Sequence, residues 1–114
     1  MRAIAEPARL DRMFFALADV NRRGMLDRLC RGPASVSELA EPLGIALPSA
    51  VKHLAVLEQG GFVASQKLGR VRTYTIELKT LEAVEKWIAK RKTQLNMQFD
   101  RLDAYLAEQK NKNP

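Results

Sequence analysis

The stretch that most restricts the possible folds of this chain runs from Val36 to Gly61 and reads VSELAEPLGIALPSAVKHLAVLEQGG. Two short runs with apolar residues at helical spacing are joined there by Gly44-Ile45-Ala46, and the second run ends at a double glycine. Glycine supplies the backbone conformation that a tight turn between two helices requires. The pattern is typical of a helix-turn-helix, in which the second helix enters a groove of DNA.

Local signals predict where these two helices begin. Ser35 and Glu38 have the spacing of a capping box, in which each side chain accepts a hydrogen bond from the backbone amide of the other residue. The second helix is expected to start around Leu47, with Pro48 in its first turn, where a missing N–H costs nothing. Helical spacing gives this helix an inward stripe made of Ala50, Leu54 and Leu57.

The opposite face of the second helix carries short polar and basic side chains, which suit base edges and phosphates. The predicted DNA contacts on this helix are Leu47, Pro48, Ser49, Val51, Lys52 and His53. Two interpretations of Val51 stay open, contact with a thymine methyl group and plain packing. For Ser49, Lys52 and His53 the alternative is a solvated helix face.

Two more helices are predicted upstream. The first follows a leader that ends near Pro7, and its apolar stripe consists of Leu10, Met13, Phe14 and Leu17. The second is capped by Asp19 and stopped by Gly32-Pro33, and its apolar face consists of Met25, Leu26, Leu29 and Cys30. Cys30 is expected to be a buried small hydrophobe, and a redox-sensing thiol is the alternative.

A β-hairpin is predicted after the second helix of the motif, because Phe62–Leu68 and Val71–Leu78 are rich in β-formers and flank Gly69. Three basic residues, Lys67, Arg70 and Arg72, cluster near its tip. They are predicted to contact phosphates or a narrow minor groove, and the alternative is a solubilising hairpin. A basic hairpin directly after a helix-turn-helix is a wing.

The last element is predicted to be one long helix opened by Thr80, since neither glycine nor proline occurs again before Pro114. From 81 to 109 it would measure about 43 Å, longer than a domain of this size can cover. Its apolar face is therefore expected to meet the same helix of a second chain. The predicted dimer contacts are Phe14, Leu81, Val84, Ile88, Leu95, Phe99 and Leu102. We expect a winged core over 1–79, the dimerisation helix of the same domain over 80–110, and a disordered tail over 111–114.

Composition narrows the function classes. The 114 residues suit a single domain, and the formal charge of +6 favours a polyanionic partner. Half of that excess lies between Pro48 and Lys79, where five Lys/Arg face two Glu. A single cysteine excludes an intrachain disulfide, and neither a signal peptide nor a membrane span is visible. These features predict a soluble cytoplasmic protein.

Catalysis and metal binding have little support in the sequence. No Gly-rich phosphate loop is present, and a metal site needs three or four ligands where this chain offers one Cys and one His on different predicted helices. We therefore expect no enzyme activity, no metal site and no cofactor. An effector is allowed for but not identified, since Trp87, Met97 and Tyr105 either line a pocket at a dimer interface or belong to the core.

The segments ALADVNRRGMLDRL, VSELAEPLGIALPSAVKHLAVLEQGGFV and KLGRVRTYTI, in this order, resemble the ArsR-type winged helix-turn-helix repressors from about Leu10 to Lys110. The ending QFDRLDAYLAEQK resembles the subgroup with an extended C-terminal helix. The fold expected is mainly α with a small β-hairpin, in the order α-α-α-α-β-β-α. The resemblance implies a homodimer built from the first and last helices, a roughly palindromic operator and repression of transcription.

Two departures from the family pattern concern its metal switch. The helix VSELAEPLG lacks the Cys-x-Cys-type motif of many metal-sensing relatives, and the last helix contains no histidine. The leading hypothesis is a dimeric DNA-binding repressor with the helix over 47–59 in successive major grooves. The alternative is a protein–protein interaction or assembly module on a winged-helix scaffold, and double-stranded RNA is a third partner class.

Overall fold

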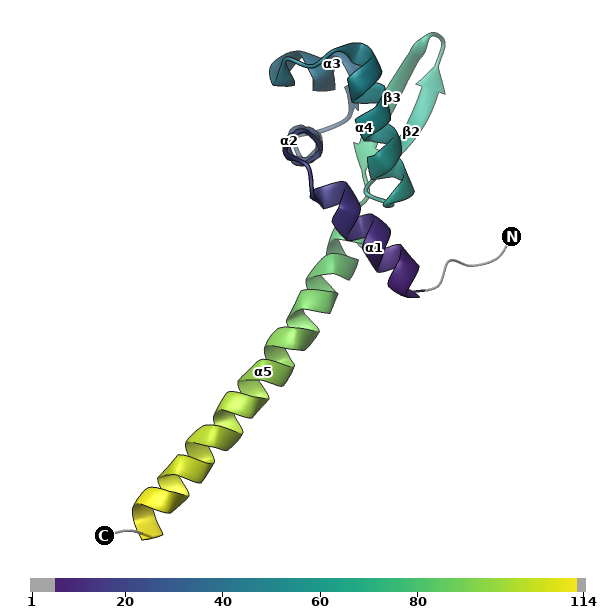
Figure 1. Ribbon diagram of the computed structural model, residues 1–114. Helices are drawn as coiled ribbons and strands as arrows, with labels where there is room; N and C mark the ends of the chain where they lie inside the picture. The colour runs from purple at the N-terminus through teal and green to yellow at the C-terminus, as the bar shows by residue number, and fades with distance from the viewer. Residues whose placement is uncertain (1–5, 113–114) are drawn as a thin grey trace. The chain divides into compact units, whose positions relative to one another are not determined.

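The computed structural model describes residues 6–112, which form five α-helices, one short 3-10 helix and three strands (Figure 1). The elements in chain order are α1 (Glu6–Leu17), α2 (Val20–Leu29), β1 (Ala34–Ser35), α3 (Val36–Ala40), η1 (Glu41–Leu43), α4 (Leu47–Gln59), β2 (Val63–Leu68), β3 (Val71–Ile76) and α5 (Leu78–Lys112). The chain forms two compact units, Met1–Leu81 and Glu82–Pro114. Among the described helices, none is both long and apolar enough to cross a membrane.

The first two helices follow local signals of the sequence. Helix α1 begins at Glu6, one residue before Pro7, near which the leader was predicted to end; residues 1–5 lie outside the described range. The predicted cap of α2 is confirmed, because Asp19 Oδ2 accepts from the amides of Asn21 at 2.9 Å and Arg22 at 3.1 Å. These bonds satisfy donors that the first turn of a helix leaves without partners.

The prediction that Cys30 is buried was wrong. Met25, Leu26 and Leu29 are buried as expected, but Cys30 is the C-cap residue of α2 and its side chain is exposed. It lines a surface hollow together with Leu26 and Ile76. A residue on the apolar side of a helix is buried only where another element packs over it, and helical spacing alone does not show whether one does.

The helix-turn-helix is confirmed, with one irregular turn. Ser35 and Glu38 form both bonds of the capping box at the start of α3. The first helix then tightens into the 3-10 turn η1, and Gly44 takes the left-handed conformation at φ 64°. Helix α4 begins at Leu47 as predicted, and the three side chains of its predicted inward stripe, Ala50, Leu54 and Leu57, are fully buried.

The hairpin is confirmed, and it belongs to a sheet with one more strand than predicted. Strands β2 and β3 pair from Val63↔Ile76 to Leu68↔Val71, with Gly69 at φ 62° in the turn. Strand β1 pairs with β3 through Ala34↔Tyr74, which gives the order β1-β3-β2. Two residues are too few to show alternation, so β1 had no signal in the sequence.

Close packing of α1 on α4 explains the glycine at the end of α4. A Cβ at Gly60 would lie 2.9 Å from Ala16 Cβ and 3.1 Å from the Arg12 carbonyl oxygen. Glycine therefore lets the two helices approach each other. The largest fully buried side chains of the core are Met13, Met25, Leu39, Leu54, Leu57 and Phe62.

Helix α5 begins at Leu78, two residues before the predicted Thr80. Thr80 is buried instead, and its hydroxyl donates to the Gly61 carbonyl. The helix has 35 residues and measures about 52 Å at about 1.5 Å per residue. It ends at Lys112, so 111 and 112 of the predicted disordered tail are helical, while 113 and 114 lie outside the described residues.

Candidate nucleic-acid interface

The first two turns of α4 present an exposed face away from the core. Ser49 and Lys52 are exposed, as is Pro48 beside them. Leu47 and Val51 each keep 51% of their surface accessible, although both are large and apolar. Five of the six side chains predicted to contact DNA on this helix are thus available together at its N-terminal half.

The N-terminus of α4 also favours an anion. Its N-cap residue, Ala46, makes no side-chain hydrogen bond, and no acidic residue stands in the first turn. The first backbone N–H groups of the helix are therefore left for a partner, and the helix macrodipole places positive partial charge there. Phosphate groups bind readily at such helix ends.

His53 is oriented differently from the other predicted contacts. Its side chain is only 22% exposed, and Nδ1 lies 3.8 Å from Asp19 Oδ2 and 3.2 Å from Arg22 Nη1. The Arg22 amide holds the pKa of Asp19 below its ordinary value, and His53 and the Asn21 amide act in the same direction. His53 is therefore tied to the start of α2, while Ser49 and Lys52 point outward.

Arg22 is a residue whose part in this arrangement the sequence analysis missed. Its side chain is buried, with Nε donating to the Ala16 carbonyl at 2.8 Å and Nη2 to the Phe15 carbonyl at 2.8 Å. The guanidinium carbon also lies 5.1 Å from the centre of the Phe15 ring. A signal existed, because position 22 precedes Met25, Leu26 and Leu29 at helical spacing and so lies on the buried stripe.

The three basic residues of the wing do not have the same surroundings. Lys67 and Arg72 are cross-strand partners, Arg70 lies in the turn, and all three are exposed. Arg72 Nη1 donates to Ser65 Oγ at 2.9 Å, and the Ser65 hydroxyl donates to Glu58 Oε1 at 3.4 Å. Arg72 thus connects the hairpin to the end of α4, whereas Arg70 and Lys67 form no such chain within residues 6–112.

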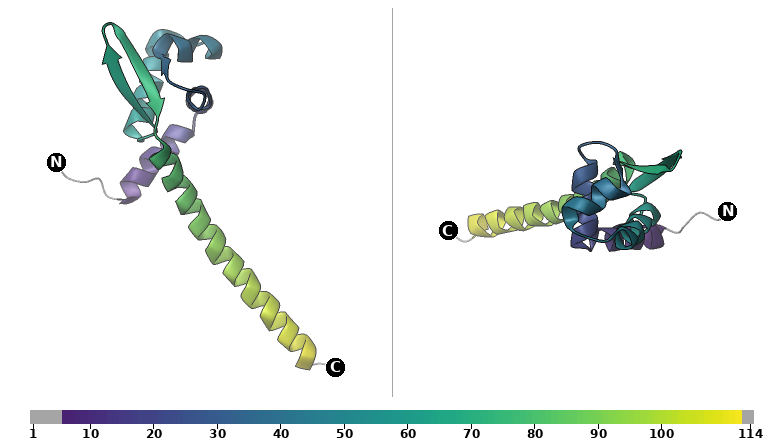
Figure 2. Two further views of the ribbon diagram at one scale, coloured as in Figure 1. Left: turned by 180° about the vertical axis from the view of Figure 1, so that it is seen from behind. Right: turned by 90° about the horizontal axis from the view of Figure 1, so that it is seen from above.

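The start of α4 and the tip of the wing lie at one end of the unit. Figures 1 and 2 show β2 and β3 running beside α4, with the hairpin tip at the end where α4 begins. The start of α4 and the turn of the hairpin accordingly lie in the same direction. An α-helix and an adjoining β-ribbon are the two elements that fit DNA grooves.

Comparison with known proteins identifies the family. A family model described as a helix-turn-helix domain matches residues 17–66. The crystal structure of an ArsR family transcriptional regulator is 47% identical, with a TM-score of 0.76, over 82% of this chain and 97% of that one. The chain belongs to the ArsR family of transcriptional regulators.

Further relatives agree with this membership. The HTH-type transcriptional regulator Rv2034 of Mycobacterium tuberculosis is 38% identical over 74 residues, which are 65% of this chain and 69% of that protein. The transcriptional repressor SdpR of Bacillus subtilis is 28% identical over 79 residues, 69% of this chain and 88% of that one. The ArsR-family chain is a DNA-binding transcriptional regulator with the winged helix-turn-helix fold predicted for it.

A solved relative is described as a dimer. The homodimeric winged helix-turn-helix DNA-binding domain of a possible ArsR-family regulator from Mycobacterium bovis is 25% identical, with a TM-score of 0.63. The match covers 82% of this chain and 94% of that one.

In the ArsR-family chain itself, no group of three His, Cys, Asp or Glu side chains within the described residues is arranged to hold a metal ion.

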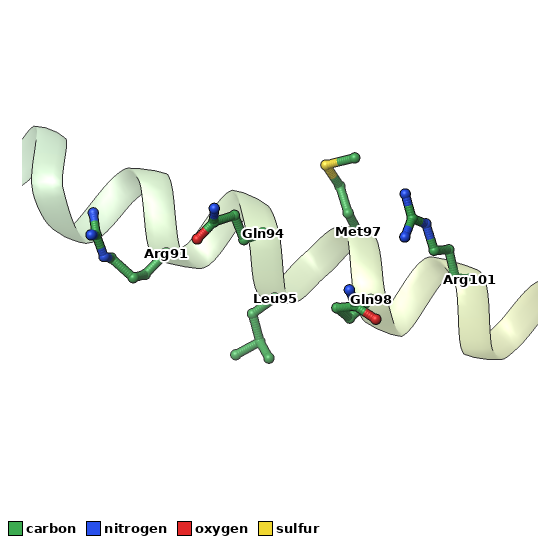
Figure 3. A pocket seen from close by; sticks show the side chains of 6 residues that line it. All are labelled: Arg91, Gln94, Leu95, Met97, Gln98 and Arg101. Carbon is green, nitrogen blue, oxygen red and sulfur yellow. The ribbon is translucent and has the colours of Figure 1, made fainter.

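Helix α5 carries most of the residues predicted to form the dimer. Leu81 and Val84 are half-buried, whereas Ile88, Leu95, Phe99 and Leu102 are exposed; Phe14 of α1 is 39% exposed. Figure 3 shows Leu95 and Met97 leaving α5 on opposite sides. Met97 therefore does not share the face of Leu95.

Trp87 of α5 is half-buried, whereas Met97 and Tyr105 lie outside any core of residues 6–112. Arg91 folds back along its own helix, with Nη1 donating to the Trp87 carbonyl at 3.1 Å and its guanidinium 4.1 Å from the ring centre. Met97 and Tyr105 are exposed, so the expectation that they pack internally does not hold for this chain. The hollow seen in Figure 3 is lined by residues of α5 alone.

Proposed function

We propose that this regulator is a cytoplasmic homodimer that represses transcription by binding a two-fold symmetric operator. The observation that carries the proposal is the pairing of an exposed, uncapped N-terminal half of α4 with a basic hairpin tip at the same end of the unit. In the proposed complex, α4 enters the major groove and the hairpin lies against the flanking backbone or minor groove. The proposed DNA contacts are Leu47, Pro48, Ser49, Val51, Lys52, Lys67, Arg70 and Arg72.

His53 has a different place in this proposal. The sequence predicted direct DNA contact, but its ring is held by Arg22 and Asp19 and is mostly covered. We therefore assign His53 to positioning α4, with any contact to DNA limited to the edge of the ring that faces away from Arg22.

Repression is supported by the Bacillus subtilis relative, which is a transcriptional repressor.

The proposed dimer uses the exposed apolar side of α5. Leu95, Phe99 and Leu102 each keep more than half of their surface accessible in the single chain. A second copy that covers them removes this surface from water, which favours association. Support comes from the homodimeric relative of Mycobacterium bovis.

A matched pair of variants tests the dimer. Leu95→Glu places a charge in the proposed interface, and Met97→Glu places the same charge on the opposite side of α5 (Figure 3). Sedimentation velocity is expected to give a monomer for Leu95→Glu and an unchanged dimer for Met97→Glu. Equal behaviour of the two variants contradicts this interface.

Selection of bound sequences from random DNA, repeated at 50 and 200 mM salt, tests the DNA-binding part. Two inverted half-sites with centres about 34–36 Å apart, one helical turn, are expected. If a dimer makes about six to eight phosphate contacts, affinity falls about 10³–10⁵-fold between these salt concentrations. Footprints without two-fold character, or a flat salt response, contradict the proposal.

A protein–protein interaction module is the second candidate, and the exposed apolar side of α5 is the observation that favours it. Charge reversal on α4 and the wing distinguishes the DNA-binding proposal from the protein–protein interaction module. Lys52→Glu with Arg70→Glu is expected to abolish DNA binding under the first proposal and to leave partner binding intact under the second. Lys90→Glu with Lys110→Glu, an equal charge change at two exposed positions of α5, serves as the control.

A further inference from the structure

Leu47 and Val51 form an apolar pair on a surface that otherwise serves polar contacts. Each is 51% exposed, while Ala50 and Leu54 of the same helix are fully buried. Residues four positions apart lie one above the other on one helix face. The packing interpretation of Val51 therefore has little support, because about half of each side chain stays accessible within residues 6–112.

The outward side of α4 offers few groups that distinguish bases by hydrogen bonding. The first two turns read LPSAVKH and contain no Asn, Gln or Arg, so Lys52 is the one side chain there of a type that makes paired bonds to guanine or adenine. Pro48 has no backbone N–H to donate. Lys52 is a flexible point charge that suits a phosphate as well as a base, and the His53 Nδ1 atom is engaged with Arg22.

One group in the major groove matches an exposed apolar side chain. Thymine presents a C5-methyl group there, and none of the other three bases presents a methyl group in the groove. Burying the methyl group against Leu47 or Val51 removes apolar surface from water on both partners. A cytosine at the same place lacks the methyl group and buries less apolar surface, so the contact carries sequence information.

The spacing of the two side chains fits neighbouring base pairs. Four residues of α-helix advance about 6 Å, and successive base pairs of DNA are about 3.4 Å apart. We propose that Leu47 and Val51 read the methyl groups of two thymines that lie within about two base steps of each other in each half-site. This inference rests on the proposed function, since it requires α4 in the major groove.

Removing the methyl groups one at a time tests the inference. The probe is a duplex that the wild-type protein has selected from random DNA, in which each thymine in turn is replaced by deoxyuridine. This change deletes the methyl group and keeps the base pair and its hydrogen bonds. Affinity is expected to fall about fourfold at two positions of each half-site and to change little at other thymines.

Variants then assign the two positions. Leu47→Ala is expected to abolish the thymine–uracil difference at one position and Val51→Ala at the other, and both should fold normally because the side chains are exposed. Lys52→Ala is the matched control, which weakens binding to every duplex and leaves the thymine–uracil ratio unchanged. Unfolding midpoints of the three variants, compared with wild type, verify that each is intact.

The possible outcomes distinguish a failure of this inference from a failure of the proposed DNA-binding function on which it rests. If no sequence is enriched from random DNA, the proposed function fails. If a symmetric site is enriched but contains no thymine pair, or binds equally well with uracil throughout, only the methyl-reading inference is overturned. Thymine sensitivity that persists in both alanine variants overturns it as well.

Discussion

Arg22 Nη1 lies 3.2 Å from His53 Nδ1, and this contact joins α2 to α4. A guanidinium carries only donors, so Nδ1 is the acceptor and neutral His53 carries its proton on Nε2. We predict that long-range ¹⁵N–¹H spectra of the neutral ring show an unprotonated Nδ1 and a protonated Nε2. Arg23→Ala should leave this pattern unchanged, and a proton on Nδ1 in the wild-type protein would contradict the contact.

Removal of the Arg22 side chain is expected to destabilise the fold. Arg22→Ala leaves the carbonyl oxygens of Phe15 and Ala16 without their donors, which costs about 2–4 kcal/mol of unfolding free energy. Arg23 makes one exposed bond to the Leu17 carbonyl, so Arg23→Ala should cost less than about 0.5 kcal/mol. Urea unfolding at one fixed protein concentration measures both, and equal effects would show that burial of Arg22 is unimportant.

Two glycines provide a matched test of helix packing. A Cβ at Gly60 meets Ala16 Cβ and the rigid Arg12 carbonyl, whereas a Cβ at Gly24 meets only the tip of the Leu43 side chain, at 2.8 Å. We predict that Gly60→Ala lowers the unfolding free energy by about 1–3 kcal/mol. Gly24→Ala should be close to neutral, because Leu43 can move and alanine favours the helix by about 1 kcal/mol. The opposite ranking in thermal unfolding would refute the close approach of α1 and α4.

The two sides of α4 should respond differently to truncation. Leu54 is fully buried, so Leu54→Ala is expected to cost about 2–5 kcal/mol of unfolding free energy. Val51→Ala removes a side chain that is 51% exposed and should change stability by less than about 0.5 kcal/mol. Chemical denaturation of the free protein checks this, and a large loss for Val51→Ala would mean that another surface covers it.

Stability is expected to fall in acid through the capping carboxylates. The Arg22 amide lowers the pKa of Asp19 from its ordinary 3.8, and the Ser35 amide and hydroxyl lower the pKa of Glu38 from 4.5. A lowered pKa in the folded chain contributes stability that is present above the ordinary values and lost as pH falls through the lowered ones. The urea concentration at the unfolding midpoint should therefore decrease as the pH falls below about 4.

Variants that cannot ionise test this assignment. Asp19→Asn and Glu38→Gln keep groups that accept hydrogen bonds at the helix starts, but they remove the titration. The acid-dependent fall of the urea midpoint should be shallower in each variant than in wild type. Identical slopes in all three proteins would place the acid sensitivity elsewhere.

Local chemistry explains which parts of the fold were predictable. Asp19, the Ser35–Glu38 pair and Gly44 act within a few residues of the helix ends they determine, so their sequence positions are sufficient. The exposure of Cys30 and the two-residue strand β1 depend on which distant elements meet them, and no local pattern contains that information. The same holds for His53, because its orientation is determined by Arg22, which lies 31 positions away.

Ser35 occupies two structures at once, since it pairs with Thr73 in the sheet and caps α3 with its hydroxyl. The preceding Ala34 is buried opposite Tyr74. Inserting or deleting one residue after Pro33 would exchange the sides of this strand, and the residue meant for the core would face water. The short connection between α2 and α3 therefore has a fixed length even though it lies at the surface, and insertions there should be tolerated far less well than insertions at the Gly69 turn.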